Sequence, residues 1–117
     1  MSDDVRPGLL LDVRAQMEEA ACAMDATLRQ GASSASIGRH GASAAGFYAP
    51  TGSLIIGGRE SHPLLLEVAS EALSFLAREQ AAADSPFGAG AVYWTNDGRC
   101  GAAGIEDLIM AVPVVRD

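Results

Sequence analysis

Four side chains that carry oxygen ligands lie close together near the end of the sequence. They are Asn96, Asp97, Glu106 and Asp107, within the stretch YWTNDGRCGAAGIEDLIMAVPVV at residues 93–115. Carboxylate and amide oxygens suit Mg²⁺ or Mn²⁺, and a loop between two strands can fold such residues together. The alternative is a simple turn, because Asn-Asp-Gly is strong turn chemistry. We therefore keep Asp97, Glu106 and Asp107 as weak metal candidates, and the pattern favours the turn.

Cys100 and the two histidines, His40 and His62, are the other reactive side chains that we considered. A thiolate beside an imidazole can act as nucleophile and base, and the same groups can bind zinc. Their spacing supports neither reading, because structural zinc sites use close pairs of Cys or His. The segment GGRES at 57–61 lacks both the P-loop and the GxGxxG pattern. We predict no catalytic and no cofactor-binding residue in this chain.

The composition predicts a single domain over residues 1–117 with a thin apolar core. Hydrophobic residues make up 49% of the 117 residues, but aromatic residues are only 5% and glycine and alanine are abundant. Small side chains bury little apolar surface each, and burial is worth about 25 cal/mol per Å². Part of the apolar surface is therefore expected to be covered by another chain.

The charge and the cysteine content limit the partners and the compartment. The net charge is −7 and every basic residue other than histidine is arginine, so a phosphate backbone would be repelled and nucleic acid is excluded as a partner. Two cysteines are too few for a disulfide framework. The acidic start MSDDVRPG is unlike a signal peptide, and no stretch approaches the ~20 apolar residues of a membrane span. We expect a reduced, cytoplasmic protein that does not bind membranes.

These residues must be positioned by a small set of helices and strands. The pattern predicts a helix at 8–30, a hairpin at 45–58, a second helix at 61–83, and strands at 91–95 and 107–115. Between the first helix and the hairpin, small and polar residues predict a loop. Strands and helices do not alternate strictly, so the predicted class is α+β: two helices on a small, mostly antiparallel sheet. The last strand lies so near the chain end that a partner is expected to complete the sheet.

Local signals predict how these elements begin and end. In the first helix, apolar residues recur every three or four positions, and Gly31 follows as a stop. Pro50 and Gly52 predict the hairpin turn, with a positive φ at Gly52. Ser61 is a candidate N-cap of the second helix, and Pro63 is placed almost as well for its first turn.

The order of segments resembles the N-terminal part of the hydantoinase B family, which includes the large subunits of ATP-dependent acetone carboxylases. The resemblance covers most of the chain. Helix LLLDVRAQMEEAACAMDATLRQGASSASIG is similar to the family's opening helix and Ser-rich turn, FYAPTGSLIIGG to its hairpin, and HPLLLEVASEAL to its next helix. The most specific piece is VYWTNDGRCGAAGIEDLIMAVPVV. There the family carries Asn-Asp-Pro-Tyr-x-Gly-Gly-Thr-His-x-x-Asp before an apolar strand.

Residue by residue, this motif is only partly kept. Asn96 and Asp97 match its opening, and Asp107 matches the terminal aspartate, a metal ligand in the carboxylase members. The motif's histidine falls on Gly104, which has no side chain to coordinate a metal. One family glycine is kept at Gly101, and the family's proline and tyrosine fall on Gly98 and Arg99. In the carboxylase members, two imidazoles and a carboxylate hold the metal. A site with only the one carboxylate would lose most of its metal affinity.

The resemblance thus implies a scaffold without chemistry of its own. Acetophenone carboxylase, a family member, carries a small additional subunit, and this short, acidic chain is similar to what such a subunit should be. Larger subunits of the complex would use ATP and a divalent metal to phosphorylate an enolised ketone and carboxylate it with bicarbonate. Two alternatives stay open: a subunit that lends carboxylates to a shared metal site, and a stand-alone module that binds a small ligand.

Overall fold

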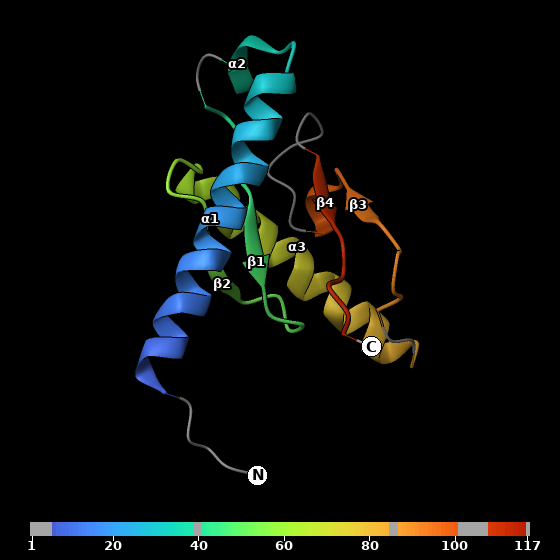
Figure 1. Ribbon diagram of the computed structural model, residues 1–117. Coiled ribbons are helices and arrows are strands. Elements are labelled where there is room, and N and C mark those ends of the chain that lie inside the picture. The colour runs from blue at the N-terminus through green and yellow to red at the C-terminus, as the bar shows by residue number, and fades with distance from the viewer. Residues whose placement is uncertain (1–5, 39–40, 85–86, 101–107, 117) are drawn as a thin grey trace. The chain divides into compact units, whose positions relative to one another are not determined.

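A computed structural model describes residues 6–38, 41–84, 87–100 and 108–116 of the chain (Figure 1). Their contacts divide the chain into two compact units, which we treat separately. Unit 1 comprises Met1–Phe47 and Leu54–Leu66, and unit 2 comprises Tyr48–Ser53 and Glu67–Asp117. The single-domain organisation stays a prediction. None of the described helices is long and apolar enough to cross a membrane.

The order of elements follows the predicted order. It is α1 (Pro7–Gly31), α2 (Ala35–Gly38), β1 (Gly46–Tyr48), β2 (Leu54–Gly57), α3 (Pro63–Ala82), β3 (Tyr93–Thr95), the 3₁₀ turn η1 (Gly98–Cys100) and β4 (Ile109–Ala111). In the described part of the chain, β1 pairs with β2 and β3 with β4, which gives two small antiparallel sheets. The α+β class is confirmed. Completion of a sheet by a partner stays a prediction.

Three local predictions needed correction. The expected loop after α1 contains the short helix α2. Ser61 does not cap α3: the N–H of Leu64 donates instead to Nδ1 of His62 at 3.2 Å, and Pro63 is the first helical residue. The last strand is shorter than residues 107–115, because β3 offers only three residues for pairing and Pro113 has no N–H to donate.

In unit 1, α1 is buried along its small and polar side. Ala21 and Asp25 are its buried residues, although an apolar stripe on a helix is usually the side that faces the core. The reason is close approach of a backbone. A Cβ atom added at Gly58 would lie 3.2 Å from the main-chain oxygen of Ala21. Small residues at this contact let the loop after β2 lie directly on the helix.

In unit 2, the turn at residues 49–53 packs against α3. The N–H of Gly52 donates to the oxygen of Ala49 at 2.9 Å, and Gly52 has φ of 97°, which confirms the predicted turn. The hydroxyl of Ser70 donates to the Gly52 oxygen at 2.6 Å. A Cβ atom on Gly52 would lie 2.4 Å from the nitrogen of Ser74, so no larger residue fits without displacement. Ala72 is buried on the same helix.

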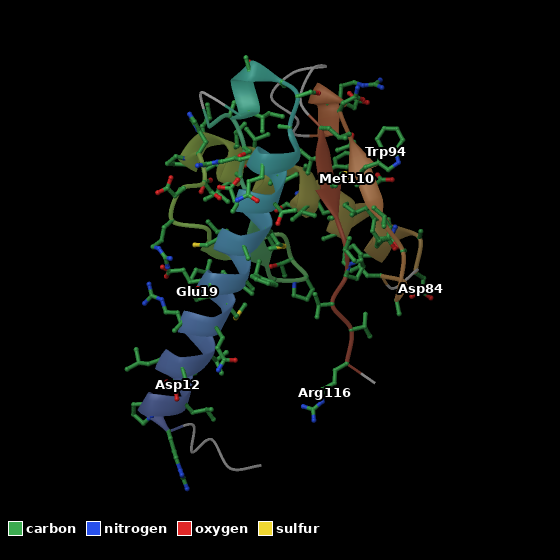
Figure 2. All side chains as sticks on the ribbon, turned by 45° about the horizontal axis from the view of Figure 1, so that its top comes forward. Asp12, Glu19, Asp84, Trp94, Met110 and Arg116 are labelled. Atoms are coloured by element: carbon green, nitrogen blue, oxygen red, sulfur yellow. The ribbon has the colours of Figure 1, made fainter. Side chains whose placement is uncertain are left out.

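Also in unit 2, β3 and β4 form an antiparallel ribbon. Trp94 is opposite Met110, and their side chains are 68% and 62% exposed (Figure 2). Their neighbours Tyr93 and Ile109 are half-buried on the other side of the ribbon. The ring of Tyr93 lies edge-on to Phe87 with centroids 5.6 Å apart. One face of the ribbon is therefore anchored while the other is open.

The Gly52 turn can be tested with a matched pair of alanine substitutions. Gly90 has φ of 77°, and an added Cβ atom would meet nothing within 4 Å, so Gly90→Ala imposes backbone strain alone. We expect Gly90→Ala to lower the free energy of unfolding by about 1 kcal/mol and Gly52→Ala by roughly 2 kcal/mol more, because of the clash with Ser74. Urea titration measures both. Equal losses in the two variants would show that the close approach to α3 is not there.

Tyr48 predicts a fall in stability at alkaline pH. Burial, and then the charge of Glu67, raise its pKa to about 12. In the unfolded chain the pKa is about 10, so the folded state holds the proton longer. Stability is unaffected below pH ~10 and decreases as pH rises from there to about 12. Tyrosinate absorbance should show one late-titrating tyrosine that Tyr48→Phe removes; the same curve in both proteins would contradict the assignment.

Candidate functional site

The best-defined polar constellation of the described residues is centred on Asp25 of α1. Asp25 is 2% exposed, and its carboxylate accepts hydrogen bonds from three side chains. Oδ1 accepts from the hydroxyl of Ser43 at 2.6 Å. Oδ2 accepts from the hydroxyl of Ser61 at 3.0 Å and from Nη2 of Arg29 at 3.1 Å. A buried carboxylate is strongly destabilising unless it is satisfied in this way.

Ser43 and Ser61 lie on two different loops, one before β1 and one before α3, that both contact Asp25. The N–H of His62 donates to the oxygen of Ser43 at 3.0 Å, which aligns the segment before β1 with the segment before α3. The N–H of Ala45 donates to the hydroxyl oxygen of Ser61 at 3.0 Å, and this hydroxyl lies within hydrogen-bond distance of both Oδ2 of Asp25 and the Ala45 oxygen. Ser43 and Ser61 are themselves buried. The cluster therefore joins α1 to both loops.

The side chain of Arg29 lies on the solvent-facing side of the cluster. Its Nε donates to the Ser43 hydroxyl at 3.3 Å, and its Nη1 to Oε2 of Glu60 at 3.2 Å. Nη2 also donates to the main-chain oxygen of Glu60. The guanidinium, one helical turn from Asp25, offsets the buried negative charge and fixes the loop after β2. Nearby, Arg59 of that loop pairs with Glu18 of α1 at 2.7 Å.

A shallow pocket of about 250 Å³ lies beside the cluster. Its lining residues are Cys22, Asp25, Ala26, Arg29, Gln30 and Glu60. Catalysis there would need an accessible nucleophile or a carboxylate with a free lone pair for a substrate proton. Ser43 and Ser61 are buried and Asp25 already accepts three hydrogen bonds, so these three side chains suit a structural role.

The metal candidates are only partly within the described residues. Oδ1 of Asp97 accepts the N–H of Arg99 at 2.9 Å, an Asx turn, and its Oδ2 accepts Nη2 of Arg99 at 2.8 Å. The hydrogen bond from the Arg99 side chain is the main reason that the pKa of Asp97 is lowered. The turn predicted here is confirmed. Glu106 and Asp107, like Gly101 and Gly104, lie outside the described residues.

The remaining candidates do not converge on one site in the described residues. His62 accepts the N–H of Leu64 at the start of α3. The thiol of Cys22 accepts the N–H of Arg59 at 3.3 Å. His40 lies outside the described residues, as does the side chain of Cys100. No group of three or more His, Cys, Asp or Glu that could hold a metal was found among the described side chains.

Comparisons of the chain with known protein families, with curated proteins and with solved structures found no match. The resemblance to the hydantoinase B family therefore rests on the order of segments and on the motif around Asn96 and Asp97.

Sequence reasoning missed the Asp25 cluster. Ser43 and Ser61 are separated from Asp25 by 18 and 36 residues, and no local pattern reports such contacts. The available signal was the Asp25–Arg29 pair, spaced one helical turn apart on the side of α1 that carries no apolar stripe. Such pairs are common on solvated helices, so the spacing alone does not indicate burial.

Removal of the Asp25 carboxylate should destabilise the protein strongly. In Asp25→Ala, two buried serine hydroxyls and Arg29 each lose a charged acceptor, and we expect the free energy of unfolding to fall by about 3 kcal/mol. Asp12→Ala is the matched control, because Asp12 lies on the exposed part of the same helix and should change stability by less than about 0.5 kcal/mol. Urea unfolding followed by circular dichroism compares them. Similar small effects would mean that the cluster does not hold unit 1 together.

Proposed function

We propose that this chain is a small, non-catalytic structural subunit of an ATP-dependent ketone carboxylase complex, similar to acetophenone carboxylase. In that complex, larger cytoplasmic subunits convert a ketone, bicarbonate and ATP to a β-keto acid. The resemblance to the hydantoinase B family supports the kind of complex. One structural observation supports the role within it: an apolar surface that is exposed among the described residues.

That surface is one face of the β3–β4 ribbon, which we call the ribbon face. Trp94 and Met110 are opposite each other on the two strands, so their side chains emerge on the same side. Val92, Leu108, Val112 and Val114 follow at every second position beyond the strand ends. They are all exposed and all apolar: Val92, Trp94, Leu108, Met110, Val112 and Val114. Trp94 and Met110 lie opposite each other at its centre (Figure 2).

An exposed face of this kind favours a protein partner. A two-stranded ribbon is marginally stable by itself, and apolar side chains that meet across strands stabilise it only when they are packed. Contiguous apolar patches on soluble proteins mark interaction sites. Trp and Met are among the residues enriched in such interfaces. A larger subunit that covers the ribbon face would supply the missing layer.

The chemistry belongs to the larger subunits in this proposal. Of the three metal candidates, the described one, Asp97, is engaged by Arg99. Gly104 occupies the position of the family's histidine. ATP and the divalent metal are therefore assigned to the partners. If this chain instead lent carboxylates to a shared site, Asp97→Ala with Asp107→Ala would lower the metal content of the complex; the proposal expects no change.

The complex itself provides the test. The tagged full chain, expressed in the cells it comes from, is expected to copurify with larger subunits that carry the complete Asn-Asp-Pro-Tyr and His-x-x-Asp motif. The purified complex should incorporate labelled bicarbonate into an aryl ketone only with ATP. Purification of the chain alone, or of a complex without ketone-dependent bicarbonate incorporation, would refute the proposal.

The ribbon face is tested by a charge placed at its centre. Met110→Asp should prevent assembly with the larger subunits, because the carboxylate would be buried without a partner. Ile55→Asp is the matched control: Ile55 is also an exposed apolar residue on a strand, but it lies on β2, outside the ribbon face. Size-exclusion chromatography of the reconstituted complex separates the outcomes. Assembly that tolerates Met110→Asp would rule out this face as the interface.

A further inference from the structure

Helix α1 carries two different stripes. One comprises Glu18, Ala21, Cys22, Asp25 and Arg29, which are buried or half-buried against the rest of unit 1. The other comprises Leu10, Val13, Met17, Ala20, Met24 and Thr27, and we call it the α1 seam. Apart from the half-buried Met17, its members are exposed; Leu10 is 57% exposed and Val13 45%. At 100° per residue, the two stripes are centred roughly 120° apart on the helix.

The α1 seam has the spacing of a helix–helix interface. Its positions alternate in steps of three and four, which is the a/d pattern of a coiled coil. The flanking positions are almost uncharged: Leu9, Gln16, Ala23 and Gln30 lie on one side, and Arg14, Ala21 and Leu28 on the other. A seam without charges can be buried with little desolvation penalty.

We propose that the α1 seam binds the α1 seam of a second copy of this chain in an antiparallel, two-fold symmetric pair. This inference does not depend on the carboxylase proposal, because it uses only α1. The flanks offer almost nothing to a charged partner helix. A membrane surface fits poorly as well, because interfacial helices are rich in Lys and Arg, whereas this chain has a net charge of −7.

Side-chain sizes favour the antiparallel arrangement. With the two-fold axis between Met17 and Ala20, each layer combines a larger and a smaller side chain. The layers are Leu10 with Thr27, Val13 with Met24, and Met17 with Ala20. In a parallel pair in register, each residue would face the same residue of the other copy. That arrangement leaves gaps at Ala20 and Thr27 and crowds the two Met24 side chains. Complementary volumes pack at the density that stable interfaces need.

Two further features fit the antiparallel pair. The hydroxyl of Thr27 donates to the oxygen of Ala23 at 2.8 Å, so its burial would leave no polar group unsatisfied. The residues from Pro7 to Gln16 are all exposed, and this end of α1 extends past β2 (Figure 1). Such a projecting segment is too short to be a stable helix by itself. In the pair, it would lie on the C-terminal half of the other copy's α1.

Sedimentation equilibrium of the isolated full chain tests the pair. The chain should dimerise, and Val13→Glu should weaken the dimer at least about a hundredfold, because two carboxylates would be buried in the interface. Ala15→Glu adds the same charge to the same helix away from the α1 seam and should leave the dimer unchanged. Circular dichroism confirms that both variants fold. A monomeric chain, or a dimer that Val13→Glu leaves intact, would overturn the proposal.

The direction of the helices is tested by disulfide trapping. In a Cys22→Ser, Cys100→Ser background, Val13→Cys and Met24→Cys are placed in separate, differently tagged chains and mixed. The antiparallel pair should give the mixed 13–24 disulfide on mild oxidation and little of either homodimer. Predominant 13–13 and 24–24 disulfides would show a parallel pair and contradict this inference.

Discussion

The buried carboxylate of Asp25 is the constraint on which the rest of unit 1 depends. A carboxyl group that is 2% exposed is costly to bury unless its oxygens are hydrogen-bonded, and the donors come from three places. Ser43 and Ser61 belong to loops on either side of the β1–β2 hairpin, and Arg29 belongs to α1 itself. Because the carboxylate cannot stay buried without them, the position of the helix and the positions of both loops are coupled.

Much apolar surface lies outside in both units. Among the described residues, the buried apolar side chains are those of Ala21 and Ala72, and alanine contributes little burial energy. α1 turns its small and polar side inward, which leaves the α1 seam exposed. In unit 2, the β3–β4 ribbon is anchored through Tyr93 and Ile109, which leaves the ribbon face exposed. A chain arranged in this way gains most from association, whether with larger subunits or with its own copy.

Among the metal candidates, Asp97 is the one that the structure describes. The carboxylate of Asp97 accepts the N–H of Arg99 in an Asx turn and also pairs with the Arg99 guanidinium. It therefore stabilises the local backbone. In the alignment that the resemblance to the hydantoinase B family implies, the family's histidine would fall on Gly104, and glycine offers no donor atom from a side chain. The described part of this loop therefore shows turn chemistry, and its carboxylate is engaged by Arg99.

Features that depend on near neighbours could be predicted from the amino-acid sequence. The two long helices, the hairpin, the positive φ at Gly52 and the turn at Asp97 follow from periodicity and turn chemistry, which act over a few residues. Two outcomes could not be predicted in this way: Ser61 donates to Asp25 and does not cap α3, and the small and polar stripe of α1 is the buried one. Those outcomes depend on contacts between residues 18 or 36 positions apart, and on the close fit of Gly58 against Ala21. Backbone geometry in three dimensions sets such contacts, and no local pattern encodes them.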